Sequence, residues 1–253
     1  MSQITNPPRF IEKRHAGILL HPTSLPGNRS NGDMGPEAYN FVDFLQSCGA
    51  TVWQMLPLGP THDGGSPYMG LSVLAGNPQL ISLQLLVDWG WLQKKEINSN
   101  DKLSSLQQAA SQFKNRADAS EQQEYSEFLQ RHEEWLTDFA LFQAIRKQQQ
   151  GRSWLDWPAP LRDKQTKAIV DTKKQLQTDI ENIYFQQFVF FKQWLALKKY
   201  ANENEVLIFG DMPIFVALDS AEVWAHREYF DLASDGKPNT IAGVPPDCFS
   251  ATG

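Results

Sequence analysis

One acidic side chain that could bind a polar substrate, Asp211, stands directly after an apolar segment that predicts a strand over residues 205–209. A long loop rich in glycine and proline, residues 242–253, lies further along the chain. Enzymes built as barrels of parallel strands display substrate-binding carboxylates at strand ends, beneath loops of this kind. From spacing alone, the alternative stays open that Asp211 caps the turn after the strand.

A second candidate lies in the loop after another apolar segment, residues 51–55, which also predicts a strand. In that loop Ser66, Pro67 and Tyr68 follow two glycines. A tyrosine offers a ring face and a hydroxyl to a ligand, although it can also pack its ring inward and leave the hydroxyl in water. If the strands are parallel, their loops meet at one end of the sheet, which is the active face in barrel enzymes.

The acidic residues expected at this end of the sheet, Asp63, Asp211 and Asp247, do not form an evident catalytic pair. A glycosidase needs two acids set across the bond that it cleaves. Cys248 has no histidine nearby in the sequence and is interpreted as an ordinary loop thiol. The five histidines lack metal-ligand spacing and no nucleotide-binding motif occurs, so we predict neither a metal nor a cofactor.

Composition narrows the class of protein. The chain has 253 residues and a formal charge of −6 without a cluster of lysine and arginine, which argues against a nucleic-acid partner. Two cysteines, Cys48 and Cys248, are too few for a disulfide framework, so we predict a reducing compartment and a cytoplasmic location. No apolar run is long enough to predict a membrane span. Eight tryptophans suit a site that stacks sugars, although aromatic residues more often form the core.

The first third of the sequence alternates strands with a helix. Residues 16–20 predict a short strand that a following proline ends. Pro36 suits the first turn of a helix, apolar residues continue at helical spacing to Cys48, and Gly49 ends the element. With the strand over residues 51–55, this order favours a parallel α/β sheet or barrel.

The middle third predicts a helical insertion. Residues 89–180 are rich in Gln, Lys and Glu, and apolar residues between Tyr125 and Ile145 follow a helical stripe. We expect Trp154 and Trp157 to anchor this insertion against the rest of the protein.

The last third returns to the first pattern, with an aromatic-rich helix over residues 183–200, the strand over residues 205–209, and a short helix predicted to start at Asp219 and Glu222. The predicted domains are residues 1–88 as the first barrel units, 89–180 as the insertion subdomain, and 181–253 as the barrel resumed. About three strand-helix units are visible, whereas a (β/α)8 barrel needs eight. The predicted fold class is therefore α/β, of the (β/α)8 TIM-barrel type, with a helical insertion and with the barrel incomplete in this chain.

Seven segments resemble, in order, the 4-α-glucanotransferases called amylomaltase or disproportionating enzyme. These segments are AGILLHPTSLPG, GDMGPEAYNFVDFL, WQMLPLGPT, GSPYMGLSVLAGNPQLIS, QFVFFKQWLALKKYANE, GDMPIFVALDSAEVW and AGVPPDCFSATG. They span most of the chain outside the predicted insertion, and seven ordered motifs are far more specific than any single one.

The resemblance implies a cytosolic (β/α)8 enzyme, without a cofactor, that transfers segments of α-1,4-glucans between maltooligosaccharides. The transfer retains configuration through a covalent glucosyl-enzyme, with two carboxyl groups about 5–5.5 Å apart. The family's nucleophilic Asp, its acid/base Glu and its third essential Asp match positions beyond Gly253. The resemblance thus implies an N-terminal fragment that lacks the catalytic residues and is inactive alone.

The same resemblance implies glucan contacts near Ser66, Pro67, Tyr68 and Asp211. It also implies a lid loop, which contains Pro245, Pro246, Asp247, Cys248 and Phe249. The sequence departs from the family where Met69 replaces a common Gln, Cys248 a common Tyr and Ala251 a common Glu, and Asp63 stands where some relatives carry a Tyr. The change at Met69 affects donor contacts, and the change at Asp63 affects a remote glucan site. The changes at Cys248 and Ala251 affect a platform for the acceptor.

Two alternatives stay open at this point. One is a non-catalytic remnant that binds α-glucans, and the other is an unrelated barrel hydrolase that uses Asp211 as an acid.

Overall fold

A parallel three-stranded sheet lies at one side of the molecule in the computed structural model, which describes residues 13–27, 31–98, 101–240, 243, 245, 246 and 248. The strands are β1 (Gly17–Leu19), β2 (Val52–Gln54) and β3 (Leu207–Phe209), in the spatial order β1-β2-β3. Leu19 lies opposite Gln54, which lies opposite Phe209. The three predicted strands are confirmed, each as a shorter element.

Helix α1 (Pro36–Ser47) connects β1 to β2, after a short 3-10 turn, η2 (Pro22–Ser24). Pro36 occupies the first turn, where its missing N–H has no helical partner to lose. Gly49 follows the end of the helix with φ +76°, a conformation that glycine adopts without steric cost. The predicted helix and its predicted end are confirmed.

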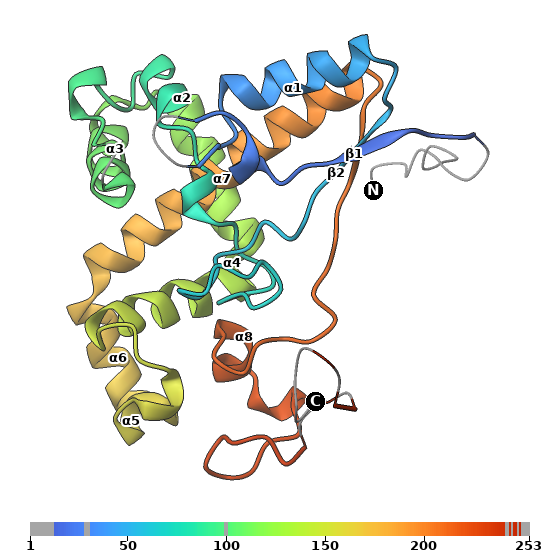
Figure 1. Cartoon of the computed structure of the whole chain (residues 1–253). Helices are drawn as coiled ribbons and strands as arrows, with labels where there is room; N and C mark the ends of the chain where they lie inside the picture. Colours follow the sequence, from blue (N-terminus) through green and yellow to red (C-terminus); the bar gives the residue numbers. More distant parts are fainter. Residues whose placement is uncertain are drawn as a thin grey trace, which may run out of the picture.

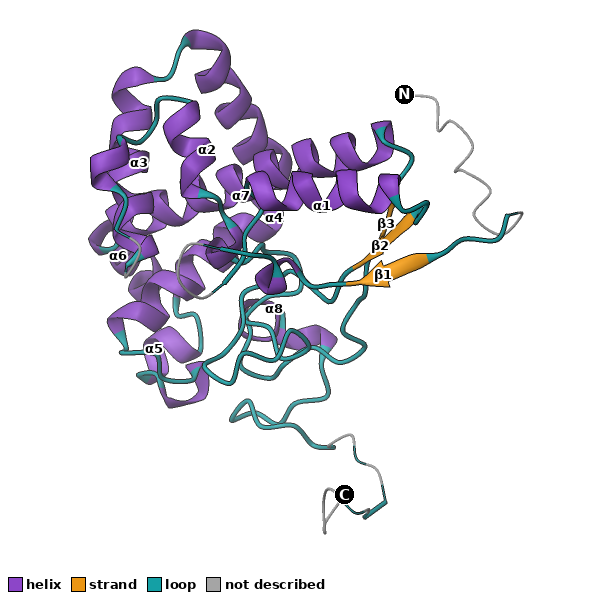
Figure 2. Cartoon of the chain, turned by 45° about the horizontal axis from the view of Figure 1, so that its top comes forward, coloured by secondary structure: helices purple, strands orange, loops and turns teal. Residues whose placement is uncertain are grey.

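A long helical segment separates β2 from β3. Its elements are η3 (Pro78–Leu80), α2 (Leu83–Asp88), η4 (Lys94–Glu96), α3 (Lys102–Arg116), α4 (Ala119–Gln148), η5 (Trp154–Asp156), α5 (Ala159–Arg162), α6 (Thr166–Gln175) and α7 (Gln177–Glu203). Figures 1 and 2 show α3, α5 and α6 on the side of the molecule away from the sheet. The predicted domain boundary after residue 180 falls inside α7, and the division into domains stays a prediction.

Two apolar cores hold these elements together. One joins the sheet to α1, α2, α3 and α7 and contains the fully buried Trp53 and Trp91. The other joins the second half of α4 to η5 and to α8 (Ala221–Ala225), with Trp154 and Trp224 fully buried. Trp157 packs edge-on against Trp224, with ring centroids 5.6 Å apart. The expectation that Trp154 and Trp157 anchor the insertion is confirmed.

The two faces of the sheet differ in how they are covered. On one face Trp53 packs against Phe41 of α1, with ring centroids 4.9 Å apart, and Figure 2 shows α1 and α7 on the same side of the strands. Side chains alternate between faces, so Leu19 and Phe209 point the other way. Among the described residues these two remain 52% and 47% exposed. Parallel sheets are normally covered on both faces, so apolar side chains as exposed as Leu19 mark a face that can take a further layer.

The chain after β3 begins with an irregular loop, residues 210–220, and continues through α8 and η6 (Arg227–Tyr229). The predicted short helix is confirmed as α8, but Asp219 is not its cap, because Ser220 is the N-cap and its hydroxyl accepts from the amide of Val223 at 3.4 Å. The Asp219 carboxylate instead accepts hydrogen bonds from Arg146 and from the amide of Trp154. No helix in the described part of the chain is both long and apolar enough to cross a membrane.

Candidate functional site

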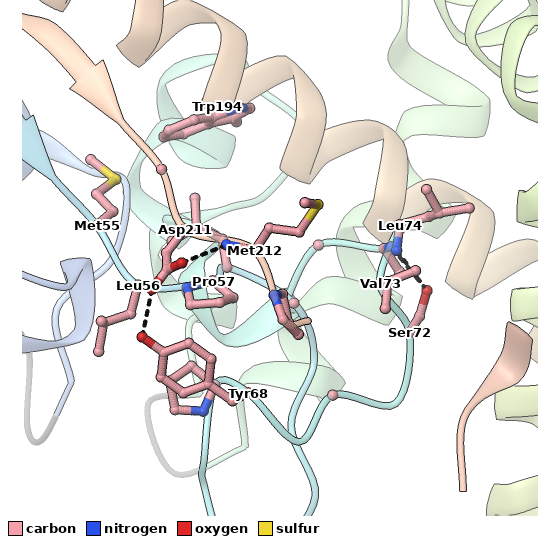
Figure 3. Close-up of a pocket in the computed structure, with 18 of the residues that line it drawn as sticks. Met55, Leu56, Pro57, Tyr68, Ser72, Val73, Leu74, Trp194, Asp211 and Met212 are labelled. Carbon is pink, nitrogen blue, oxygen red and sulfur yellow. Dashed lines mark hydrogen bonds between the residues drawn. The ribbon is translucent and has the colours of Figure 1, made fainter. Parts of the chain in front are cut away.

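Tyr68 and Asp211, which lie 143 positions apart in the sequence, meet at the carboxyl ends of β2 and β3. The Tyr68 hydroxyl donates to Oδ2 of Asp211 at 2.6 Å, and the amide of Met212 donates to Oδ1 at 2.8 Å (Figure 3). Asp211 does bond to the turn after its strand, as one interpretation expected, but it also holds a tyrosine from another loop. Both side chains are open to solvent and hence to a ligand.

Each partner of this hydrogen bond shifts the proton affinity of the other. The hydrogen bond from Tyr68, followed by that from the Met212 amide, lowers the pKa of Asp211. The same hydrogen bond, with the nearby negative charge, raises the pKa of Tyr68. At neutral pH the site therefore presents an ionised acceptor beside a protonated donor. A carboxyl group held ionised is a poor proton donor, which weighs against Asp211 as the acid of an unrelated hydrolase.

A pocket of about 290 Å³ lies beside this pair, between the loops after β2 and β3 and one side of α7. The polar side chains that line it include Tyr68, Asp211 and Ser72, and Figure 3 shows Trp194 of α7 on the opposite side from Tyr68. The other lining residues that matter here are apolar: Met55, Pro67, Phe190, Phe191, Met212 and Phe215. Apolar walls with a few polar groups at the rim are typical of small-molecule sites.

A short hairpin, residues 61–70, carries Tyr68. Thr61 and Gly70 form an antiparallel bridge at its base. The amide of Gly65 donates to the carbonyl of His62 at 2.9 Å to form the turn, where Gly65 has φ +70°. Pro67 and Tyr68 line the pocket, whereas Ser66 does not, and its carbonyl accepts from the amide of Met69.

Two buried glutamines of α7 fix the next segment, residues 70–82, which forms another wall of the pocket. The Gln187 amide accepts from the N–H of Gly76 at 2.8 Å and donates to its carbonyl at 2.9 Å. Gln193 binds the N–H and carbonyl of Ser82 in the same way, at 2.7 and 3.0 Å. A Cβ on Gly76 would lie 2.0 Å from the Phe190 ring, so only glycine fits there.

Ser72 stabilises the turn in this wall. Its hydroxyl accepts from the amides of Leu74 and Ala75, both at 3.1 Å, and donates to Glu222 of α8 at 2.5 Å. Ser72, Gln187 and Gln193 were not predicted from the sequence as site residues. For the glutamines a signal was present, since each interrupts an otherwise apolar stretch of the aromatic-rich helix.

Neither the loop after β1 nor the described part of the predicted lid lines the pocket. His21, in the loop after β1, pairs through Nδ1 with the Thr23 hydroxyl at 2.7 Å, and burial lowers its pKa. Of the predicted lid, Pro245, Pro246 and Cys248 are exposed. Asp247 and Phe249 lie outside the described residues. No group of three or more metal-ligating side chains occurs among the residues described.

The fold and the site define an α/β protein whose candidate binding site lies at the carboxyl ends of parallel strands, the position at which α/β enzymes bind their substrates. The profile of the family described as 4-alpha-glucanotransferase matches residues 20–253. The chain belongs to this 4-alpha-glucanotransferase family.

Individual relatives agree with the family profile. The chain is 44% identical to a 4-alpha-glucanotransferase of Thermus thermophilus over 95% of its length, and 42% identical to one of Synechocystis sp. over 96%. It covers 50% and 52% of these two proteins. The solved amylomaltase from Streptococcus agalactiae in complex with acarbose matches 94% of this chain, with TM-score 0.88 and 37% identity, and the match covers 51% of that protein. The chain thus spans about half the length of the relatives it matches.

Proposed function

We propose that this chain provides the glucan-binding half of a 4-α-glucanotransferase. The observation that carries the proposal is the Tyr68–Asp211 pair at the carboxyl ends of two parallel strands, in a chain that belongs to this family. The proposed substrates are α-1,4-glucans and maltooligosaccharides, and the reaction passes a glucan segment to the 4-hydroxyl of another chain. The complex of the Streptococcus agalactiae amylomaltase with acarbose supports acarbose as a first ligand to test.

The chemistry of the pocket suits a sugar. Asp211, ionised at neutral pH, accepts hydrogen bonds from hydroxyl groups, and Tyr68 presents a ring and a hydroxyl beside it. The apolar faces of glucose rings can pack on the aromatic side chains of α7, such as Trp194. These residues bind and orient the glucan, while bond cleavage by a retaining mechanism requires two further carboxyl groups. We place those groups beyond Gly253, and we place Pro245 to Phe249 in a lid over the site.

The proposed architecture is a (β/α)8 barrel of which this chain forms the first part. It is supported by the sheet face on which the side chain of Leu19 is 52% exposed. In the loop after β3, Met212, Ile214 and Phe215 are exposed as well. Further strand-helix units would cover this apolar surface. The proposed location is the cytoplasm, where Cys48 and Cys248, both exposed, would remain reduced.

Titration of the intact protein from its natural gene with maltoheptaose or acarbose tests the binding role. Replacing Asp211 with Asn is expected to weaken binding roughly 10- to 100-fold, because a hydrogen bond to a charged group contributes about 1.5–3 kcal/mol. The matched control is Asp43→Asn, which removes the negative charge from a tyrosine–aspartate bond of equal length, from Tyr200 at 2.6 Å, between α1 and α7. Equal affinity in the Asp211 variant and the control would refute the binding role.

Product analysis tests the reaction. Incubation of the intact protein with maltotriose is expected to give glucose and longer maltooligosaccharides. Hydrolysis products alone would exclude the transferase, and saturable binding without turnover would instead support a glucan-binding remnant.

A further inference from the structure

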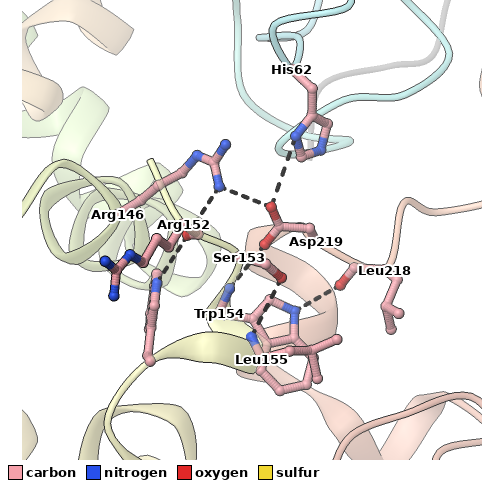
Figure 4. A network of polar contacts seen from close by, with 9 residues as sticks. His62, Arg146, Arg152, Ser153, Trp154, Leu155, Leu218 and Asp219 are labelled. Carbon is pink, nitrogen blue, oxygen red and sulfur yellow. Dashed lines mark hydrogen bonds and ion pairs between the residues drawn. The ribbon is translucent and has the colours of Figure 1, made fainter. Parts of the chain in front are cut away.

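Asp219 is the centre of a polar network that lies outside the pocket. Its Oδ2 accepts from Nη1 of Arg146 at 2.8 Å, and its Oδ1 accepts from the amide of Trp154 at 3.1 Å (Figure 4). Nδ1 of His62 lies 3.8 Å from Oδ2 on another side. The three partners come from α4, from η5 and from the hairpin of residues 61–70. One carboxylate thus contacts three segments that are distant in the sequence.

The network is shielded from solvent. The side chains of Arg146, Asp219 and His62 are 13%, 21% and 24% exposed. Arg146 also donates to the carbonyl of Arg152 at 3.2 Å, which fixes the guanidinium on the chain that leads into η5. Charge-assisted hydrogen bonds with little solvent contact are short and strong. Asp219 is therefore fixed to α4 and η5 by these hydrogen bonds, and the hairpin contacts Asp219 through His62.

The contact between His62 and Asp219 is a second link between the two loops that carry Tyr68 and Asp211. Asp219 belongs to the loop that carries Asp211, and His62 belongs to the hairpin that carries Tyr68. The amide of His62 donates to the carbonyl of Met69 across the hairpin at 3.4 Å, so its two arms are coupled. A displacement of His62 is therefore transmitted to the arm with Tyr68.

The base of the hairpin has its own attachment to α8. The amide of Ala221 donates to the carbonyl of Leu71 at 2.9 Å, and Ser72 bonds to Glu222. Loss of the His62 contact should hence leave the base in place and change only the position of the arms. The expected effect is local and falls on Tyr68.

We propose that Asp219 is a positioning residue for glucan binding. It sets the Tyr68 hairpin against the Asp211 loop and fixes both on helix α4 of the insertion. The part that concerns glucans rests on the proposed function. The geometric part does not, because the hydrogen bond between Tyr68 and Asp211 can be measured without a ligand.

The test uses the intact protein with 13C-labelled tyrosine, and follows the ionisation of Tyr68 by NMR together with the affinity for maltoheptaose. In Asp219→Ala we expect the pKa of Tyr68 to fall toward that of an ordinary tyrosine and the dissociation constant to rise about tenfold, while Asp219→Glu restores much of both. His62→Ala, which keeps the Asp219–Arg146 pair, should shift both quantities in the same direction by less. If Asp219→Ala fails to fold, His62→Ala decides.

The matched control is Asp138→Asn. Asp138 of α4 lies 3.4 Å from Nζ of Lys164 and 3.6 Å from Nε2 of His226, so it also joins the insertion to the region of α8 but does not contact the hairpin. It should leave Tyr68 and the affinity unchanged. An unshifted Tyr68 in folded Asp219→Ala, or shifts as large in Asp138→Asn, would overturn the proposal. If the unmodified protein binds no glucan, the proposed function fails, and the Tyr68 titration still tests the positioning role.

Discussion

Replacement of Gln187 by Met is expected to destabilise the protein strongly, because it removes the clamp on Gly76. Methionine has nearly the same length and shape, so the change deletes two hydrogen bonds with little change in volume. The N–H and carbonyl of Gly76 would then have lost the partners that they have in the buried amide. Each of these two unsatisfied buried groups costs about 1–3 kcal/mol, which gives a loss of roughly 2–6 kcal/mol in the free energy of unfolding.

Thermal and denaturant unfolding of the intact protein measure this loss. The loss should appear as a lower Tm and as a lower denaturant midpoint. Gln193→Met should behave similarly, because Gln193 clamps Ser82 with the same geometry. The control is Gln177→Met on the same helix, where the exposed Gln177 amide donates to Glu181, and an effect below about 0.5 kcal/mol is expected. If Gln187→Met were as stable as this control, the reasoning from paired buried groups would be wrong.

Three further predictions concern single side chains. Burial lowers the pKa of His132, so folding favours the neutral form of this side chain. Its contribution to the free energy of unfolding should be fully present above the ordinary histidine pKa of about 6.5 and should be lost as the pH falls below that value. In unfolding measurements between pH 5 and about 8, His132→Gln should flatten this dependence. Tyr68→Phe should raise the pKa of Asp211 toward its ordinary value, which carboxyl NMR titration measures, and an unchanged titration would show that the hydrogen bond is not formed in solution. Gly76→Ala should destabilise by roughly 1–3 kcal/mol, because the new methyl group overlaps an aromatic ring, whereas Gly64→Ala has open space and should change stability by less than about 0.5 kcal/mol.

The elements that the sequence predicted well are those that depend on local signals. The strands and α1 are marked by apolar runs, by Pro36 at the start of the helix and by Gly49 after its end. Placing loops at one end of a parallel sheet also put Tyr68 and Asp211 on the same candidate face. Their direct hydrogen bond could not be predicted, because it depends on the path of a hairpin that spacing does not specify.

Predictions from the sequence fail where a side chain with a local pattern is bound by a segment that is distant in the sequence. Asp219 and Glu222 match the pattern of a helix start, yet Trp154 and Arg146 bind the carboxylate, and Ser220 takes the capping position. A local pattern cannot reveal such a competitor.

The long helical connection between β2 and β3 has a consequence for the order in which the chain folds. These strands pair directly, although about 150 residues separate them, and closing so long a loop costs conformational entropy before any strand hydrogen bond forms. Folding of α4 onto α7 shortens the effective loop, because α7 leads directly into β3. Substitutions in the contact between α4 and α7 should therefore slow folding, whereas substitutions in β3 should mainly accelerate unfolding. We therefore expect the contact between α4 and α7 to form before the second and third strands pair.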